Sequence, residues 1–313
     1  MQPFGYTGYR YDNVANTYFA QAREYVPGMG RFAGEDWIKG SILSSINLNQ
    51  YIYCISNPIK YIDLNGKECI AVSGGIYSAE EQRIGEYYYE FLDVTIAQIH
   101  EWKKSGKNNI TWIVADAGWT SYDKDSIKNI ANDEGVELVY IKNKGEFINY
   151  LNTRKKPYIP PIANPSNATK RQITRKEDLI SDVSIFSHGL GKEGEIVSLG
   201  YNYDSEYDVS LNLTISDIYS INMEAFNTPL TNFYSCNTGT DKKSSFAQKW
   251  VNRVGGITYA FAGTTTYTGV TDLGYLQKLK RFFKINSGLG GDTKMPGASE
   301  NVEKIIFTPN CAE

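Results

Sequence analysis

From residue 108 onward, short apolar runs alternate with stretches in which apolar residues recur every three or four positions. Short runs that are almost wholly apolar are typical of strands buried on both faces, and the longer period is typical of amphipathic helices. Strands separated by helices favour parallel pairing through crossover connections. We therefore predict an α/β domain over 108–313, with a mostly parallel sheet flanked by helices. The predicted strands are 110–115, 136–141, 183–187, 232–235 and 257–262, the predicted helices are 123–134, 146–152, 216–226 and 244–254, and 195–199 and 207–215 are predicted as extra hairpin strands.

Residues 67–107 have a different pattern. Ser78 to Glu81 matches a helix capping box, and apolar residues follow at helical spacing as far as Lys104. We interpret 67–107 as a linker and a connecting helix that leads into the α/β domain.

The first 66 residues form a third region. They are rich in tyrosine, and Gly, Pro, Asn and Asp interrupt them every few positions. This texture predicts short strands joined in β-hairpins. The region has too few apolar residues to bury a core of its own, so we expect it to pack on a larger body.

The composition narrows the classes of function. The chain of 313 residues is 41% hydrophobic, which is enough for a sizeable core, and its net charge of −3 offers no basic surface to nucleic acid. The sequence contains no apolar run of about 18 residues, the length that would predict a membrane span. The four cysteines are widely spaced and only two histidines are present, so we predict reduced thiols and no metal site. A strand-like run rather than a helix follows the glycine pattern of 189–194, so we also predict no nucleotide cofactor.

Two strand ends carry the residues best suited to catalysis. His188 and Gly189 follow the predicted strand 183–187, and Cys236 follows the predicted strand 232–235. In open α/β sheets, reactive groups collect at the carboxyl ends of the strands, which would bring the imidazole and the thiol together. The N-terminus of the helix that follows Cys236 would also stabilise a thiolate.

We therefore predict that His188 is a general base and Cys236 a nucleophile. The main-chain N–H groups of Gly189 and Cys236 are the predicted donors to an oxyanion, and the missing Cβ of Gly189 allows close approach. Asp116 ends the run 110–115, which we take as the first strand of the sheet. Its carboxylate is a candidate specificity group for a Lys or Arg side chain of the substrate, and a plain turn or capping role is the alternative.

Both motifs resemble those of the caspase-like cysteine peptidases, a fold that includes metacaspases, gingipains, separases and the CHAT domains. Members carry an apolar strand that ends in His-Gly and a later strand that ends in a small residue plus Cys, as at 183–189 and 232–236. The likeness covers about residues 108–270. It implies a caspase-like sheet and a cysteine endopeptidase. The Gln-Ala-Cys pentapeptide of the caspases is absent from this sequence, so cleavage after aspartate is not implied.

Residues 1–66 resemble the C-terminal end of the core of rearrangement-hotspot (Rhs, or YD-repeat) proteins, because aromatic, Arg, Gly and Asn-Pro positions recur in the family's order. In that family the repeats form a hollow β-shell that cleaves itself near this end and carries a variable toxin. The resemblance implies Asp36 and Asp63 as the aspartyl pair for self-cleavage, although the family's prolines beside both aspartates are replaced here. It also implies a secreted effector delivered into a target cell, where it acts on a protein substrate in a reducing compartment. The parent shell and an immunity protein are the further partners that it implies.

Several alternatives stay open. A His188/Cys236 pair also suits a deamidase or an acyltransferase, and a caspase-like domain can act as a non-catalytic scaffold that recruits a partner. Cys236 is also compatible with a structural thiol. The basic, proline-rich segment 153–178 is either a solvated surface loop or an activation loop beside the site.

Overall fold

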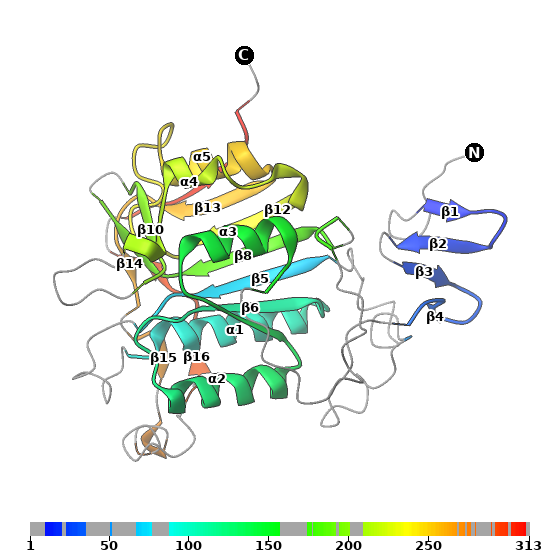
Figure 1. Cartoon of the computed structure of the whole chain (residues 1–313), viewed down its shortest axis with the longest axis horizontal. Coiled ribbons are helices and arrows are strands. Elements are labelled where there is room, and N and C mark those ends of the chain that lie inside the picture. Colours follow the sequence, from blue (N-terminus) through cyan, green and yellow to red (C-terminus); the bar gives the residue numbers. More distant parts are fainter. Residues whose placement is uncertain are drawn as a thin grey trace.

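Figure 1 shows the computed structural model of the chain. The structure describes residues 10–20, 23–35, 51, 67–76, 88–156, 174–176, 178–191, 194–200, 209–267, 269–272, 274–276, 279, 289, 292–299 and 302–310.

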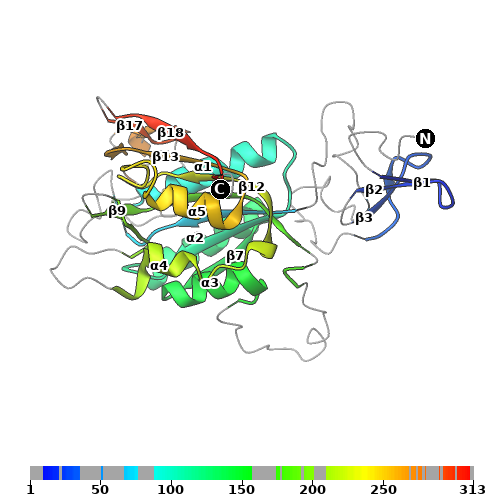
Figure 2. The ribbon, with the colours of Figure 1, turned by 90° about the horizontal axis from the view of Figure 1, so that it is seen from above.

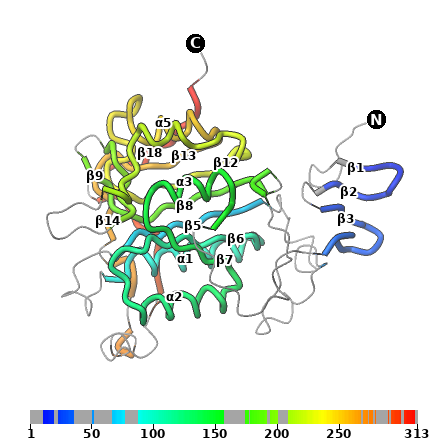
Figure 3. Tube along the Cα trace, viewed as in Figure 1, coloured from blue at the N-terminus to red at the C-terminus, as the bar shows by residue number. Residues whose placement is uncertain are grey.

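The largest element is a seven-stranded sheet in the order β18-β13-β12-β8-β5-β6-β7. Every neighbouring pair is parallel except β13 and β18, which pair antiparallel at one edge. β8 and β12 run side by side near the middle of the sheet (Figure 3). This arrangement confirms the predicted α/β class with a mostly parallel sheet. The strands are β5 (Glu68–Ser73), β6 (Ile110–Ala115), β7 (Glu137–Ile141), β8 (Ile180–Phe186), β12 (Phe226–Phe233), β13 (Ile257–Phe261) and β18 (Lys304–Phe307).

Helices cover both faces of the sheet. One face packs against α3 (Lys144–Thr153), α4 (Ile215–Ile218) and α5 (Phe246–Val254). The other face packs against α1 (Glu90–Lys104) and α2 (Ser121–Glu134). In the view from above, α1 and α3 lie on opposite sides of the strands (Figure 2). Because both faces are covered, β5 and β6 are apolar at most positions rather than at every second one.

The sequence explains the limits of α2 well. Thr120 and Asp123 form a reciprocal capping box at its start, and Gly135 adopts a left-handed conformation at its end. These two signals bracket the predicted helix 123–134, which the structure extends by two residues to Ser121–Glu134.

Two predicted elements differ from the structure, and one strand of the sheet is not predicted. The segment 67–107 contains β5, a strand in the middle of the sheet, where the sequence pattern predicts only a linker and a helix. The pattern fails because β5 begins with Glu68, a fully buried carboxylate. The predicted helix 216–226 is wrong: α4 ends at Ile218, and a 3₁₀ turn, Met223–Ala225, leads into β12. The antiparallel strand β18 is not predicted at all. The capping box at 78–81 lies outside the described residues.

The N-terminal region contains a separate antiparallel sheet in the order β1-β2-β3-β4, which confirms hairpins for its described part. Arg23 stacks on the ring of Phe32, at 3.6 Å from the ring centroid, and Phe32 is nearly fully buried. The strands are β1 (Arg10–Asp12), β2 (Thr17–Ala20), β3 (Arg23–Val26) and β4 (Arg31–Phe32).

Small antiparallel sheets lie beyond the ends of the central strands. A three-stranded sheet in the order β11-β10-β9 follows β8 in the sequence, and it contains short versions of both predicted hairpin strands. Two further ribbons pair β14 with β17 and β15 with β16. The strands are β9 (His188–Leu190), β10 (Ile196–Ser198), β11 (Asn212–Thr214), β14 (Thr265–Thr266), β15 (Thr271–Asp272), β16 (Asp292–Thr293) and β17 (Gly297–Ala298).

Among the described helices, none has the length and apolar character that crossing a membrane requires.

Candidate functional site

The carboxyl ends of β8 and β12 bring His188 and Cys236 to the same place. The parallel register pairs Ile185 with Phe233, and the Tyr234 N–H donates to the Ile185 carbonyl at 2.9 Å. Two residues beyond the Ile185–Phe233 pair, the hydroxyls of Ser187 and Ser235 hydrogen-bond to each other with their oxygens 2.9 Å apart. Both serines are buried. This contact fixes the residues that directly precede His188 and Cys236 against each other.

The main chains of the two motifs are in direct contact. A Cβ placed on Gly189 would overlap the Cys236 main chain, at 2.7 Å from its carbonyl carbon and 2.8 Å from its nitrogen. No larger residue fits at position 189 without moving one strand end, so the glycine is required for this approach. Gly194, in the loop after β9, packs in the same way against the main chain of Asn237. The sequence therefore brings the His-Gly and Cys-Asn segments together through their backbones.

Cys236 is half-buried, and its sulfur has two contacts from Thr265. The Thr265 N–H donates to Sγ at 3.3 Å, and the Thr265 hydroxyl oxygen lies 3.2 Å from Sγ. The Thr265 hydroxyl donates to the Tyr234 carbonyl at 3.4 Å, which helps to hold Thr265 in place. The Tyr267 hydroxyl donates to the same carbonyl at 2.8 Å. An N–H donor directed at sulfur stabilises negative charge on that atom.

This donor differs from the one that the sequence predicts. The helix α5 begins at Phe246, two residues after its predicted start, and the Ala247 N–H in its first turn donates to the Thr238 carbonyl at 3.0 Å. Within the described ranges, the hydrogen bonds to the sulfur come from Thr265 and not from α5. Asn237 takes up the sharp turn after the cysteine, with a φ of 60° that asparagine tolerates better than most residues.

The His188 imidazole packs edge-on against Phe91, the second residue of α1. The ring centroids are 5.0 Å apart and the planes meet at 76°. Phe91 is buried and packs in turn against Tyr267, at 5.2 Å between centroids. His188 itself is half-buried and belongs to β9, where its register partner is Ser198. The imidazole therefore has a fixed aromatic wall on one side.

Asp116 follows a strand that is not adjacent to β8. It follows β6, and β5 separates β6 from β8, so Asp116 is not at the end of the first strand. Its carboxylate forms an ion pair with Lys124, at 2.6 Å between Oδ1 and Nζ. The strand whose end borders β8 is β5, where the Gly74 N–H donates to the Phe186 carbonyl at 2.8 Å. The prediction that Asp116 ends the first strand is thus wrong, because the polar start of β5 concealed that strand.

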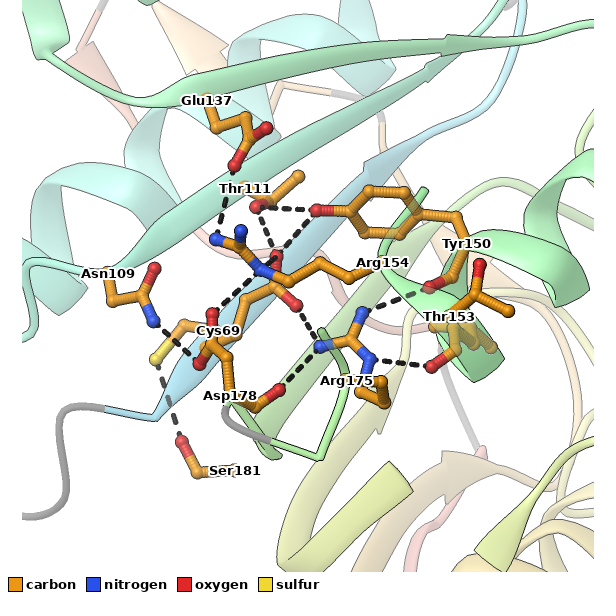
Figure 4. A network of polar contacts seen from close by, with 12 residues as sticks. Cys69, Asn109, Thr111, Glu137, Tyr150, Thr153, Arg154, Arg175, Asp178 and Ser181 are labelled. Carbon is orange, nitrogen blue, oxygen red and sulfur yellow. Dashed lines mark hydrogen bonds and ion pairs between the residues drawn. The ribbon is translucent and has the colours of Figure 1, made fainter. Parts of the chain in front are cut away.

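The opposite, amino-terminal edge of the sheet carries a network of buried charges, shown in Figure 4. Glu68 is fully buried, and Arg175 donates to it through a short contact. Arg154 lies 3.6 Å from the same carboxylate and 2.7 Å from Asp178. Tyr150 also donates to Glu68, at 2.6 Å. The two arginines neutralise two carboxylates that would otherwise be costly to bury.

The pKa values of the two carboxylates depend on the balance between burial and the charges of their neighbours. Burial would raise the pKa of Glu68, but Arg175 and Arg154 hold it below its usual value. Burial and the neighbouring Glu68 carboxylate raise the pKa of Asp178 to about 6, against the opposing effect of Arg154. The described ends of the segment 153–178 are therefore held at the amino edge of the sheet by these ion pairs. The interpretation of that segment as a loop beside the site does not hold for these ends.

Two predicted positions cannot be placed, because Asp36 and Asp63 lie outside the described residues. No group of three or more His, Cys, Asp or Glu side chains in the described part of the chain is arranged to hold a metal ion. Cys69 and Cys236 are both free thiols. Burial and the neighbouring Asp182 raise the pKa of the Cys69 thiol above its ordinary value.

Comparison with known proteins adds no relative: no family model, no curated protein and no solved structure matches this chain.

Sequence reasoning missed two parts of the site. Thr265, which contacts the sulfur, follows a predicted strand, and its only signal is a short run of threonines at 264–266. Phe91, which packs on the imidazole, reads as an ordinary apolar position of a helix. Their roles depend on how β14 and α1 fold back over the end of the sheet, which local pattern does not encode.

Proposed function

We propose that this chain is a cysteine endopeptidase of caspase-like type that uses His188 and Cys236 as a catalytic dyad. The observation that carries the proposal is the contact between Gly189 and the Cys236 main chain, which sets the two motifs side by side. Both residues are half-buried rather than buried, and the Thr265 N–H supplies a donor to the sulfur.

The chemistry follows from the roles of these groups. His188 accepts the proton of the Cys236 thiol, and the thiolate attacks the carbonyl carbon of a peptide bond. Negative charge moves to the carbonyl oxygen, where the N–H groups of Gly189 and Cys236 are the proposed donors. The carbon–nitrogen bond then breaks as His188 returns its proton to the leaving amine, and a thioester remains. His188 next takes a proton from water, whose oxygen attacks the thioester carbonyl. The carbon–sulfur bond breaks, the acid is released, and His188 returns the proton to the sulfur, which restores the thiol.

The N-terminal region gives this peptidase a biological setting. The likeness of residues 1–66 to the end of an Rhs core supports the proposal that the α/β domain is the toxin of a polymorphic effector, delivered into a target cell. In the same proposal Asp36 and Asp63 release it from the shell, and an immunity protein protects the producer. The hairpins β1 to β4 are compatible with such a shell fragment.

Mass spectrometry distinguishes this activity from its alternatives. We expect the full chain, incubated with extracted cell proteins, to create new protein termini, and the same incubation with Cys236→Ala to create none. A Cys236-dependent mass gain of about one dalton at glutamine or asparagine, without new termini, would replace the peptidase with a deamidase. Equal results for both chains would favour a non-catalytic scaffold.

A further inference from the structure

The segment that follows β13 reaches both members of the candidate dyad. Thr265 contacts the Cys236 sulfur. Tyr267, two residues later, is buried and packs against Phe91 of α1. Phe91 packs in turn on the His188 imidazole. The segment therefore touches the proposed nucleophile directly and reaches the proposed base through one aromatic ring.

The Tyr267 hydroxyl is bound to the strand that carries the nucleophile. It donates to the main-chain carbonyl of Tyr234 at 2.8 Å, and Tyr234 lies two residues before Cys236. The Tyr234 ring stacks on Phe186, with the ring centroids 4.7 Å apart and the planes at 9° to each other. Phe186 lies two residues before His188. The hydroxyl end of Tyr267 is thus anchored where the ends of β8 and β12 are packed together.

The ring of Tyr267 sets the position of Phe91. The two ring centroids are 5.2 Å apart and the planes meet at 87°, and Phe91 meets the His188 imidazole in the same kind of edge contact. Both Tyr267 and Phe91 are buried. Aromatic pairs of this kind have a preferred geometry, and a close-packed interior leaves little room for one ring to move alone. A displacement of Tyr267 would therefore pass through Phe91 to the imidazole.

The position of the imidazole decides how well it takes a proton. A general base has to lie within hydrogen-bond reach of the proton that it abstracts, and a base of a nucleophile is commonly oriented by a third group. We propose that Tyr267 is a positioning residue, which holds the His188 imidazole, through Phe91, within reach of the Cys236 thiol. This inference rests on the proposed peptidase function and identifies the third group of its site as a pair of aromatic rings.

The test measures the rate at which iodoacetamide alkylates Cys236 in the full chain at neutral pH, together with kcat and KM for one cleaved peptide. The variants are Tyr267→Leu, Phe91→Leu and Tyr267→Phe, the last of which keeps the ring. Both leucine variants are also made in a His188→Ala background. The control is Tyr140→Leu on β7, which removes a half-buried ring whose hydroxyl donates to the Lys124 carbonyl at 3.3 Å. Thermal melting shows which variants are folded at the assay temperature.

We expect Tyr267→Leu and Phe91→Leu each to slow alkylation by about 10- to 100-fold, because a small misplacement of the base is costly. For the peptide, kcat should fall by a similar factor while KM stays nearly constant. Tyr267→Phe loses one neutral hydrogen bond and should be slower by only about 2- to 5-fold. In the His188→Ala background neither leucine variant should slow alkylation further, since both act through the imidazole. Tyr140→Leu should react at the wild-type rate.

Three results would count against the inference, and they are distinguishable. Wild-type alkylation rates in the leucine variants, with a slow His188→Ala chain, would overturn the positioning role alone. So would a leucine variant that slows alkylation equally with and without His188, since its ring would then act on the sulfur or on the fold. A His188→Ala chain that reacts as fast as the wild type would overturn the dyad and this inference with it. If Tyr267→Leu does not fold, Phe91→Leu decides, because it leaves the hydroxyl contact of Tyr267 in place.

Discussion

The two edges of the central sheet place charged and reactive groups in opposite ways. At the amino edge, Glu68 and Asp178 are buried and each is bound by arginine. At the carboxyl edge, His188 and Cys236 are half-buried, and among the described residues the hydrogen bonds to the sulfur come from Thr265. The same parallel strands thus carry a buried network of ion pairs at one end and a partly exposed histidine and cysteine at the other.

This difference separates stability from chemistry. Removing one partner from a buried ion pair leaves an uncompensated charge, so the amino edge should govern unfolding. Groups that stay accessible contribute little packing, so the carboxyl edge should tolerate substitution while losing function. This division is tested by measuring both activity and stability for substitutions at each edge.

The largest expected effect is on catalysis. Cys236→Ala should lower the rate of peptide cleavage by about 10⁴-fold or more, because the nucleophile is removed, and should also abolish toxicity. The melting temperature should stay close to that of the wild type. The matched control is Cys69→Ala at the amino edge, which should retain cleavage. Retained cleavage or toxicity in Cys236→Ala would refute the catalytic role of this cysteine.

The next effect is on stability. Arg175→Met should lower the free energy of unfolding by about 3–5 kcal/mol, because Glu68 would keep its burial and lose its closest cation. Denaturant titration measures this difference. Lys242→Met provides the comparison, since it breaks an exposed ion pair with Glu303 and should change stability very little. Equally small changes in the free energy of unfolding in both variants would show that the amino-edge network is not a main source of stability.

The third effect depends on pH. The pKa of Asp178 is about 6 in the folded chain, above its usual value of 3.8. Between these two pH values the folded chain therefore binds more protons than the unfolded chain. The Asp178 contribution to stability is therefore present at low pH and is lost as pH rises through about 6. Asp178→Asn lacks this dependence.

Accordingly, the unfolding free energy of Asp178→Asn relative to the wild type should rise between about pH 4 and 7, by up to about 1.4 kcal/mol per pH unit. The depressed pKa of Glu68 acts in the opposite direction, since its stabilisation is lost as pH falls through the folded value, and it is present in both proteins. Denaturant titrations at several pH values measure the difference. A constant difference across this range would contradict the raised pKa of Asp178.

The smallest expected effect concerns the sulfur contacts. Thr265→Val removes the hydroxyl beside Sγ and keeps the main-chain N–H, so it should lower kcat/KM by only about 2- to 10-fold. Steady-state kinetics on one peptide are sufficient to measure it. Thr266→Val is a neighbouring control, whose hydroxyl contacts Ser299 at 2.6 Å instead. A loss as large as that of Cys236→Ala would mean that the hydroxyl has a direct part in the reaction.

The sequence predicts the parts of this fold that depend on local pattern. The strand β6, the helix α2 with its capping box and terminal glycine, and most of β8 follow from periodicity and turn signals, whereas the predicted strand 232–235 overlaps only the last two residues of β12. Parallel pairing also predicts that the ends of β8 and β12 share one edge. The site residues His188 and Cys236 follow from that rule, whereas their catalytic roles remain proposals.

The remaining parts depend on contacts between distant residues. β5 escapes prediction because its first residue, Glu68, is stabilised by arginines more than 80 positions downstream. The contact of Thr265 with the sulfur and of Phe91 with the imidazole requires the folded positions of β14 and α1.

The most direct test of the dyad is the rate at which iodoacetamide alkylates each cysteine, followed by peptide mass spectrometry. We expect Cys236 to react and the buried Cys69 to remain unmodified in the folded chain. Because His188 is proposed to take the thiol proton, His188→Ala should slow the alkylation of Cys236 by about 100-fold while the melting temperature stays unchanged. Equal rates in the wild type and in folded His188→Ala would contradict the pairing of imidazole and thiol on which this account depends.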